Sequence, residues 1–163
     1  MKEKKEILEE TLMKISTKGI YALEIVVDLA MHSTKDSWES LKNIANRRNL
    51  SEKYLERIVK RLKDKGIVTS IRGAHGGYYL AKEANEITAY EVLAAVENDL
   101  VLIPCLLDEG KCDGNIDTCR VQEVWYRLWE RIQKTTKEVT LQSIVDEVEK
   151  ISEETGEVWY ESI

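Results

Sequence analysis

Hydrophobic residues recur every three or four positions in three consecutive segments of the first half of the chain. The first segment covers residues 17–32, where Thr17 is a suitable N-cap, and the second begins at Ser37. The third follows Ser51, another suitable N-cap, and Gly66 stands where that helix would end. This spacing predicts three amphipathic helices. Their core-facing residues are expected to be Ile20, Leu23, Val27, Ala30, Leu41, Ile44, Ala45, Tyr54, Leu55, Ile58, Val59 and Leu62.

After Gly66 the hydrophobic pattern changes from helical spacing to short runs. Residues 67–71 and 78–80 are rich in Ile, Val, Tyr and Leu, which favours two short strands. Three glycines, at positions 73, 76 and 77, indicate the tip of a hairpin between these strands. Three helices followed by a glycine-rich hairpin predict a winged helix-turn-helix.

The second half of the chain predicts further helices. Thr88 and Glu91 form a capping box that opens a short helix. Residues 121–139 show a long amphipathic pattern, and a short acidic helix and tail follow from Thr140. The apolar stripe of the long helix predicts a dimer interface, and packing against its own domain is the open alternative. The stripe consists of Val121, Val124, Trp125, Leu128 and Ile132, and Trp129 widens it.

These patterns predict a mainly α protein with a small β-hairpin wing, a winged helix-turn-helix plus a long dimerisation helix. A chain of 163 residues can bury one sizeable core. A charged N-terminus and the lack of a long apolar run favour a cytoplasmic protein with no membrane partner. The predicted parts are an N-terminal extension (1–14), a DNA-binding domain (15–98), a cysteine loop (99–120), and a dimerisation helix with an acidic C-terminal tail (121–163).

The charge distribution supports an anionic partner for the first half of the chain. The formal net charge is −6. Residues 15–82 nevertheless hold 13 basic and seven acidic side chains, a net charge of +6. Residues 83–163 hold seven basic and 19 acidic side chains, a net charge of −12, and residues 1–14 are neutral. This asymmetry raises the odds of an anionic partner for residues 15–82, although an ordinary solvated surface would also explain it.

The polar face of the third helix is the candidate DNA contact. Lys and Arg neutralise phosphates and contact guanine edges, while a carboxylate can accept a hydrogen bond from cytosine. Arg72 stands at the hairpin tip, beside glycines such as Gly73 that allow close approach to a minor groove. His75 lies in the same tip and is either a phosphate contact or a solvated side chain. The polar face comprises Lys53, Glu56, Arg57, Lys60, Arg61 and Lys63.

All three cysteines lie in one segment, PCLLDEGKCDGNIDTCR. Cys105, Cys112 and Cys119 are separated by two equal gaps of six residues, among Gly, Asp and Asn residues that favour a loop. Three converging thiolates suit an iron–sulfur cluster or zinc, with a fourth ligand from elsewhere. The alternative is three loop thiols with no joint task. No acid–base constellation typical of a catalytic site accompanies the cysteines, and only two histidines exist, so an enzyme is not expected.

Several blocks match a known family in order: ISTKGIYALEIVVDLA, SLKNIA, LSEKYLERIVKRLKDKGIVTSIRGAHGGYYLAK and EITAYEVLAAVE. The chain resembles, over roughly residues 14–137, the bacterial winged-helix iron–sulfur regulators typified by IscR and NsrR. The resemblance implies a homodimer that binds a palindromic double-stranded DNA operator. It also implies an iron–sulfur cluster, of the 2Fe–2S type, held by Cys105, Cys112 and Cys119. The DNA contacts it implies are Ser51, Lys53, Glu56, Arg57 and Arg72.

The chain departs from that family at the expected fourth ligand. Gln122 stands where IscR has a histidine, and Ile20 stands where NsrR has an aspartate. The fourth ligand therefore stays open among Gln122, Glu123, solvent, a small thiol and a residue of the partner subunit. The alternative function is a cluster-free repressor of the CymR type, controlled by an enzyme partner or a small metabolite. Its docking surface would be the acidic second half.

Overall fold

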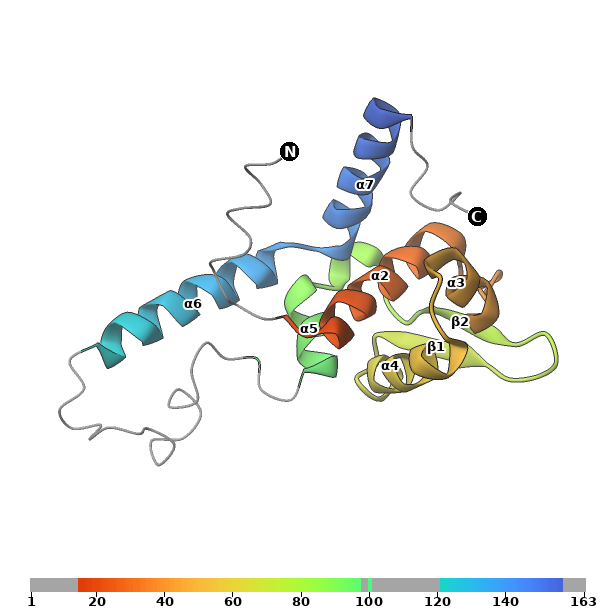
Figure 1. Ribbon diagram of the computed structural model, residues 1–163, viewed down its shortest axis with the longest axis horizontal. Coiled ribbons are helices and arrows are strands. Elements are labelled where there is room, and N and C mark those ends of the chain that lie inside the picture. The colour runs from red at the N-terminus through yellow and green to blue at the C-terminus, as the bar shows by residue number, and fades with distance from the viewer. Residues whose placement is uncertain (1–14, 98–99, 101–120, 157–163) are drawn as a thin grey trace.

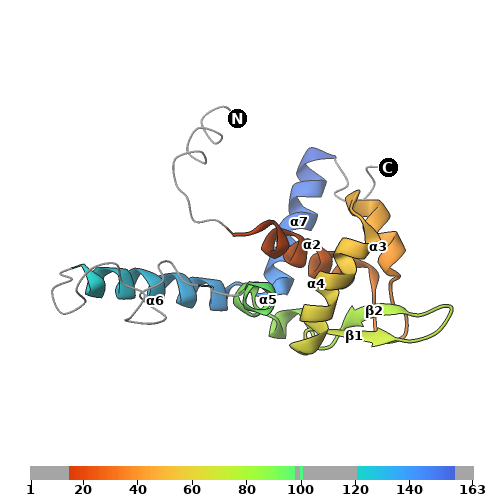
Figure 2. The ribbon, with the colours of Figure 1, turned by 60° about the horizontal axis from the view of Figure 1, so that its bottom comes forward.

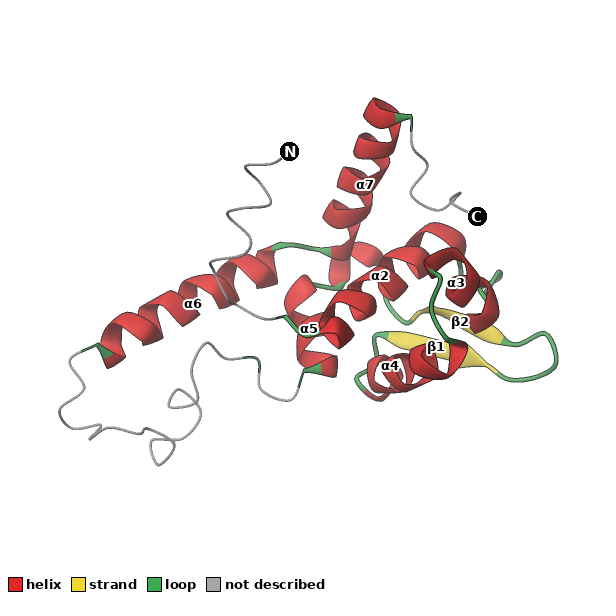
Figure 3. Cartoon of the chain, viewed as in Figure 1, coloured by secondary structure: helices red, strands yellow, loops and turns green. Residues whose placement is uncertain are grey.

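The structure of the protein is a computed structural model that describes residues 15–97, 100 and 121–156. Within these residues only one two-stranded hairpin interrupts the helices (Figure 1 and Figure 3), which confirms the predicted fold class. None of the helices in the described part is long and apolar enough to span a membrane. The elements are α2 (Thr17–His32), α3 (Leu41–Arg48), α4 (Glu52–Asp64), β1 (Val68–Ile71), β2 (Gly77–Leu80), η1 (Ala84–Glu86), α5 (Ala89–Val96), α6 (Gln122–Glu138) and α7 (Leu141–Thr155).

Helix α2 is the centre of the core. It contacts α4, α5, α7 and β2, so most of its circumference is covered. Ala22, Ile25, Val26 and Leu29 are fully buried, whereas Ile20, expected on the core face, is 48% exposed. That expectation was wrong for Ile20, whereas Val27 from the same predicted set is buried.

Two predicted helix starts are displaced in the structure. Helix α3 begins at Leu41 rather than Ser37, because the Ser40 hydroxyl accepts a hydrogen bond from the Asn43 N–H at 3.1 Å and caps the helix. Helix α2 takes Ser16 rather than Thr17 as its N-cap residue. The Ser16 hydroxyl forms no cap and instead donates to the Glu97 carboxylate at 2.5 Å. A local cap thus decides the start of α3, whereas the Ser16 side chain at the start of α2 makes a long-range contact.

Helix α4 begins and ends where the sequence predicts. The Ser51 hydroxyl accepts from the Tyr54 N–H at 3.2 Å. At the other end Gly66 has a φ of +69°, the left-handed conformation that glycine adopts without strain. The Gly66 N–H bonds to the Lys63 carbonyl at 2.9 Å and the Ile67 N–H to the Leu62 carbonyl at 3.0 Å. This turn sends the chain directly from α4 into β1.

The strands β1 and β2 pair antiparallel, with Val68 opposite Leu80 and Ile71 opposite Gly77. Glu39 adds an isolated bridge to Tyr78 on the free edge of β2. A Cβ atom at Gly77 would collide with the Glu39 carbonyl oxygen and with the Trp38 ring. The glycine is therefore required for the close approach of residues 38 and 39 to the hairpin.

The start of α7 belongs to the same core, which the sequence did not predict. Thr88, capped reciprocally with Glu91, forms a bridge with Thr140. Leu141 and Val145 are buried among the residues of the winged-helix core. Beyond this first turn α7 leaves the domain, and α6 projects from the end opposite the hairpin (Figure 1 and Figure 2).

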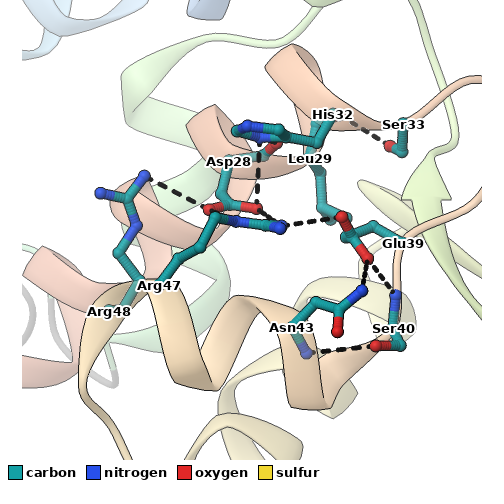
Figure 4. Close-up of polar contacts among 9 residues, drawn as sticks. All are labelled: Asp28, Leu29, His32, Ser33, Glu39, Ser40, Asn43, Arg47 and Arg48. Atoms are coloured by element: carbon teal, nitrogen blue, oxygen red, sulfur yellow. Dashed lines mark hydrogen bonds and ion pairs between the residues drawn. The ribbon is translucent and has the colours of Figure 1, made fainter. Parts of the chain in front are cut away.

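A buried carboxylate joins α2 to α3 (Figure 4). The Asp28 side chain is fully buried and accepts hydrogen bonds from Arg47 Nη2 at 2.6 Å and Arg47 Nε at 3.0 Å. Arg48 Nη2 lies 3.4 Å from the other side of the same carboxylate, at Oδ2. The hydrogen bond to Asp28 raises the pKa of Arg47, whereas burial lowers the pKa of Arg48. Two guanidinium groups thus compensate one desolvated carboxylate.

The network continues to Glu39 through the same guanidinium. Arg47 Nη2 donates to Glu39 Oε2 at 2.9 Å, and Asn43 Nδ2 donates to Glu39 Oε1 at 2.8 Å. Burial by itself raises the pKa of the Glu39 carboxyl, but the hydrogen bonds from Asn43, Arg47 and the Ser40 N–H outweigh it and hold the pKa below its ordinary value. Glu39 is therefore a carboxylate at neutral pH.

Asp28→Asn should lower the free energy of unfolding by about 3 kcal/mol, because two largely buried guanidinium groups lose their shared carboxylate. Urea denaturation followed by circular dichroism measures the loss. Glu83→Gln is the matched control. It removes one carboxylate from the exposed Lys35–Glu83 pair and should change the unfolding free energy by less than about 0.5 kcal/mol. Equal effects of the two substitutions would show that the buried network does not stabilise the fold.

Candidate nucleic-acid interface

Helix α4 separates its apolar and polar residues onto two faces. Leu55, Ile58, Val59 and Leu62 are buried against the rest of the domain. The predicted contact residues on this helix are all exposed, although the Ser51 hydroxyl also caps the helix. They are Ser51, Lys53, Glu56, Arg57 and Lys60.

A groove of about 500 Å³ lies between the hairpin, the start of α3 and one side of α4 from Glu52 to Lys63. It brings Glu56 of α4 together with Arg72 and Gly73 of the hairpin tip. Of the predicted contacts, Lys53, Arg57 and Lys60 lie outside the groove lining, on the exposed surface of α4. The lining also includes Ser40, Lys42, Glu52, Lys63, Ser70 and Gly76.

Two lysines line the groove: Lys42 of α3, which the sequence did not predict as a contact, and Lys63, which was predicted on the polar face of α4. Lys63 Nζ donates to the Ser70 hydroxyl of β1 at 2.5 Å, so it connects α4 to the hairpin. Arg61, which the sequence placed on the polar face, donates from Nη1 to the Val96 carbonyl at 2.8 Å. It therefore supports the C-terminus of α5. In the sequence, only the helical spacing of Lys42 and Lys63 from the apolar residues of their helices indicates where these side chains lie.

The hairpin tip is a five-residue loop, Arg72 to Gly76, with an exposed Arg72 at its start. Gly73 has a φ of +127°, which side-chain-bearing residues rarely adopt. The Gly76 N–H closes the loop on the Gly73 carbonyl at 3.0 Å. A Cβ at Gly76 would collide with the Ile71 carbonyl oxygen. The glycines thus set the narrow tip that presents Arg72.

Most of the predicted dimer stripe on α6 is exposed. No residue of α6 is fully buried. Val121 and Val124 are each 54% exposed, Leu128 is 42% and Trp125 is 37%, whereas Ile132 is partly buried. Such a contiguous apolar face on a projecting helix is typical of a protein interface.

The cysteines lie outside the described residues. In the described part, 15–97, 100 and 121–156, no group of three or more His, Cys, Asp or Glu side chains is arranged to hold a metal ion. The predicted cysteine site, at Cys105, Cys112 and Cys119, therefore stays a prediction. Its two flanks are described: α5 before it and α6 after it.

Comparison with known proteins identifies the family. The model of the Rrf2 family, described as an iron-dependent transcriptional regulator, matches residues 15–147. The chain belongs to the Rrf2 family of transcriptional regulators. This Rrf2 protein is thus a DNA-binding winged-helix regulator, in a family that is not enzymatic.

Relatives of two kinds are similar to this Rrf2 chain. The regulator IscR of Pectobacterium carotovorum is 36% identical over 137 residues, 84% of this chain and 82% of that protein. The regulator CymR of Bacillus subtilis is 38% identical over 132 residues, 81% of this chain and 89% of that protein. The solved structure of this CymR, the global cysteine regulator, has a TM-score of 0.66 at 36% identity and covers 83% and 98% of the two chains. That of T. potens IscR has a TM-score of 0.65 at 33% identity and covers 85% and 90%.

Arg72→Ala should weaken binding to a duplex operator selected from random DNA, and should reduce the log–log salt slope by about 0.9, the value for one phosphate contact. Glu56→Ala should relax sequence preference more than it weakens affinity, because a carboxylate that accepts from cytosine selects bases. Fluorescence anisotropy at several salt concentrations measures both effects. Lys35→Ala is the control, since this exposed lysine lines a different groove. An unchanged affinity in Arg72→Ala would remove the wing from the interface.

Proposed function

We propose that this regulator binds a palindromic operator as a homodimer, and that an iron–sulfur cluster held by Cys105, Cys112 and Cys119 sets its affinity for DNA. The observation that carries the proposal is the position of the cysteines. All three fall in the segment between α5 of the DNA-binding domain and the exposed helix α6. A ligand in this segment can act on both elements.

The donor set fits an iron–sulfur cluster. Three thiolates are the soft ligands that such clusters prefer, and the family description names iron. When bound, the cluster would supply oxidant-sensitive redox chemistry, and Cys105, Cys112 and Cys119 would hold it. A 2Fe–2S cluster is the form that the resemblance of the sequence to the winged-helix iron–sulfur regulators implies.

The fourth ligand is not one of the residues used by the relatives. Ile20 is apolar, and His32 Nδ1 lies 2.9 Å from the Asp28 carbonyl oxygen and 3.6 Å from its carboxylate. Glu123 accepts a hydrogen bond from Arg127 Nε at 2.9 Å, which competes with metal binding. Gln122, the first residue of α6, is a weak amide ligand. These features favour an exchangeable fourth ligand and a site that loses iron readily.

The chain residues before the cysteine segment connect it to the recognition helix. The Val96 carbonyl accepts from Arg61 of α4 at 2.8 Å and from Lys18 of α2 at 3.4 Å. The next residue, Glu97, accepts from the Ser16 N–H at 3.2 Å. The end of α5 is thus tied to the helix that contacts DNA, which supports control of DNA binding from this segment.

The second candidate is a cluster-free repressor of the CymR type. It is favoured by the similarity to CymR, which matches the similarity to IscR in both sequence and structure. An enzyme partner or a small metabolite would then set DNA affinity. The cysteines would have no joint task, and the acidic second half of the chain would be the docking surface.

Anaerobic reconstitution with iron and sulfide distinguishes the two candidates. The wild-type protein should become coloured, with a charge-transfer absorbance, and should lose the colour in air. Replacing any one of Cys105, Cys112 or Cys119 by Ala should abolish iron and sulfide retention, whereas Gln122→Ala should leave it largely intact. A wild-type protein that stays colourless after reconstitution would favour the CymR-type repressor.

Leu128→Glu should convert the dimer into monomers with poor operator binding, because it buries a carboxylate in the apolar interface of α6. A single winged helix contacts only one half-site, so both copies are needed for a palindrome. Sedimentation velocity at micromolar concentration measures the association state. Lys134→Glu also adds an acid to α6, but on another face, and should remain dimeric. A monomeric wild type would contradict this interface.

A further inference from the structure

Trp38 and Glu39 form a short extended segment that holds the hairpin from one side. The Glu39 N–H donates to the Tyr78 carbonyl at 2.9 Å, and the Tyr78 N–H donates back to the Glu39 carbonyl at 2.8 Å. Trp38 Nε1 donates to the His75 carbonyl in the tip at 2.6 Å. The segment therefore contacts both the strand β2 and the tip loop.

The indole packs against the hairpin as well as bonding to it. The Trp38 ring lies so close to Gly77 that a Cβ atom there would meet ring atom Cδ1 at 2.8 Å. The ring is still 37% exposed, so it lies at the edge of the domain rather than in its core. A side chain of this size at such a site contributes little to core packing and much to the placement of the tip.

The same segment is fixed to the helix-turn-helix from its other side. The Glu39 carboxylate is bound by Arg47 and Asn43 of α3, and Arg47 also binds the buried Asp28 of α2 (Figure 4). Ser40, the next residue, caps α3. The hairpin is thus connected, through Glu39 and Arg47, to the buried carboxylate of Asp28.

We propose that Trp38 is a positioning residue for DNA binding. Its indole N–H holds the tip at His75, so that Arg72 and Gly73 stay across the groove from Glu56 on α4. A two-stranded hairpin with four-residue strands is only marginally stable by itself, so its tip requires such a contact to keep one position. The proposal rests on the proposed DNA contact of Arg72, because Trp38 acts through that residue.

A double-mutant cycle of Trp38→Phe and Arg72→Ala tests the proposal on operator affinity. Trp38→Phe keeps an aromatic ring and removes the indole N–H. It should weaken binding about threefold to tenfold, the effect of one lost hydrogen bond. In the Arg72→Ala background the same substitution should have almost no effect, because the contact that it positions is already absent. Tyr79→Phe removes one polar group from an aromatic residue that lines a different groove, and should leave affinity unchanged.

Amide hydrogen exchange gives an independent measurement on the free protein. Trp38→Phe should accelerate exchange at the Glu39 and Tyr78 amides, while the global unfolding free energy changes little. If the two substitutions weaken operator affinity independently, so that their fold-losses multiply in the double mutant, the positioning role is overturned. Unchanged operator affinity in Trp38→Phe would also overturn it. A third outcome is that Arg72→Ala alone leaves operator affinity unchanged while Trp38→Phe still accelerates amide exchange. In that case Arg72 does not contact DNA, and Trp38 holds the hairpin without a role in DNA binding.

Discussion

The Asp28 carboxylate is the contact on which the DNA-binding unit depends. A fully buried carboxylate is costly unless charged donors compensate it, and both donors come from the end of α3. The position of α3 against α2 is therefore fixed by ionic geometry as well as by apolar packing. Because α4 follows α3 after a short turn, the position of α3 also restricts the position of α4. Arg47 carries the same constraint to Glu39, and Glu39 carries it to the hairpin.

The hairpin depends on contacts outside its own two strands. Lys63 joins β1 to α4. Residues 38 and 39 join β2 and the tip to α3, and the missing side chain of Gly77 leaves room for these two residues beside the hairpin. The groove that contains Glu56 and Arg72 is bounded by these contacts. The width of the groove is thus set by the helix-turn-helix and not by the intrinsic preference of a hairpin with two four-residue strands. The small wing therefore has a defined position.

The sequence predicted correctly those features that depend only on interactions between neighbouring residues. The Ser51 cap, the Thr88–Glu91 capping box, the turn at Gly66 and the hairpin glycines all need only neighbouring residues. Features set by distant partners were missed: the burial of Asp28, the phase of α2 and the docking of Leu141 in the core. The contact residues of α4 could be predicted as exposed. Their meeting with Arg72 across a groove depends on tertiary packing.

In the proposed function, DNA binding and the signal that controls it belong to different parts of the chain. IscR and CymR have the same frame at TM-scores of 0.65 and 0.66 to this chain, because the frame is determined by the shared core. The segment with the three cysteines lies between α5 and α6 in the sequence. At its start, Val96 and Glu97 are bonded to α4 and α2, and at its end the apolar stripe of α6 begins at Val121. In the proposed function, a ligand of this segment, whether a cluster on three thiolates or a partner molecule, would act between α4 and the helix that would pair the two copies. One frame can in this way serve different signals, with the chemistry of the segment selecting among them.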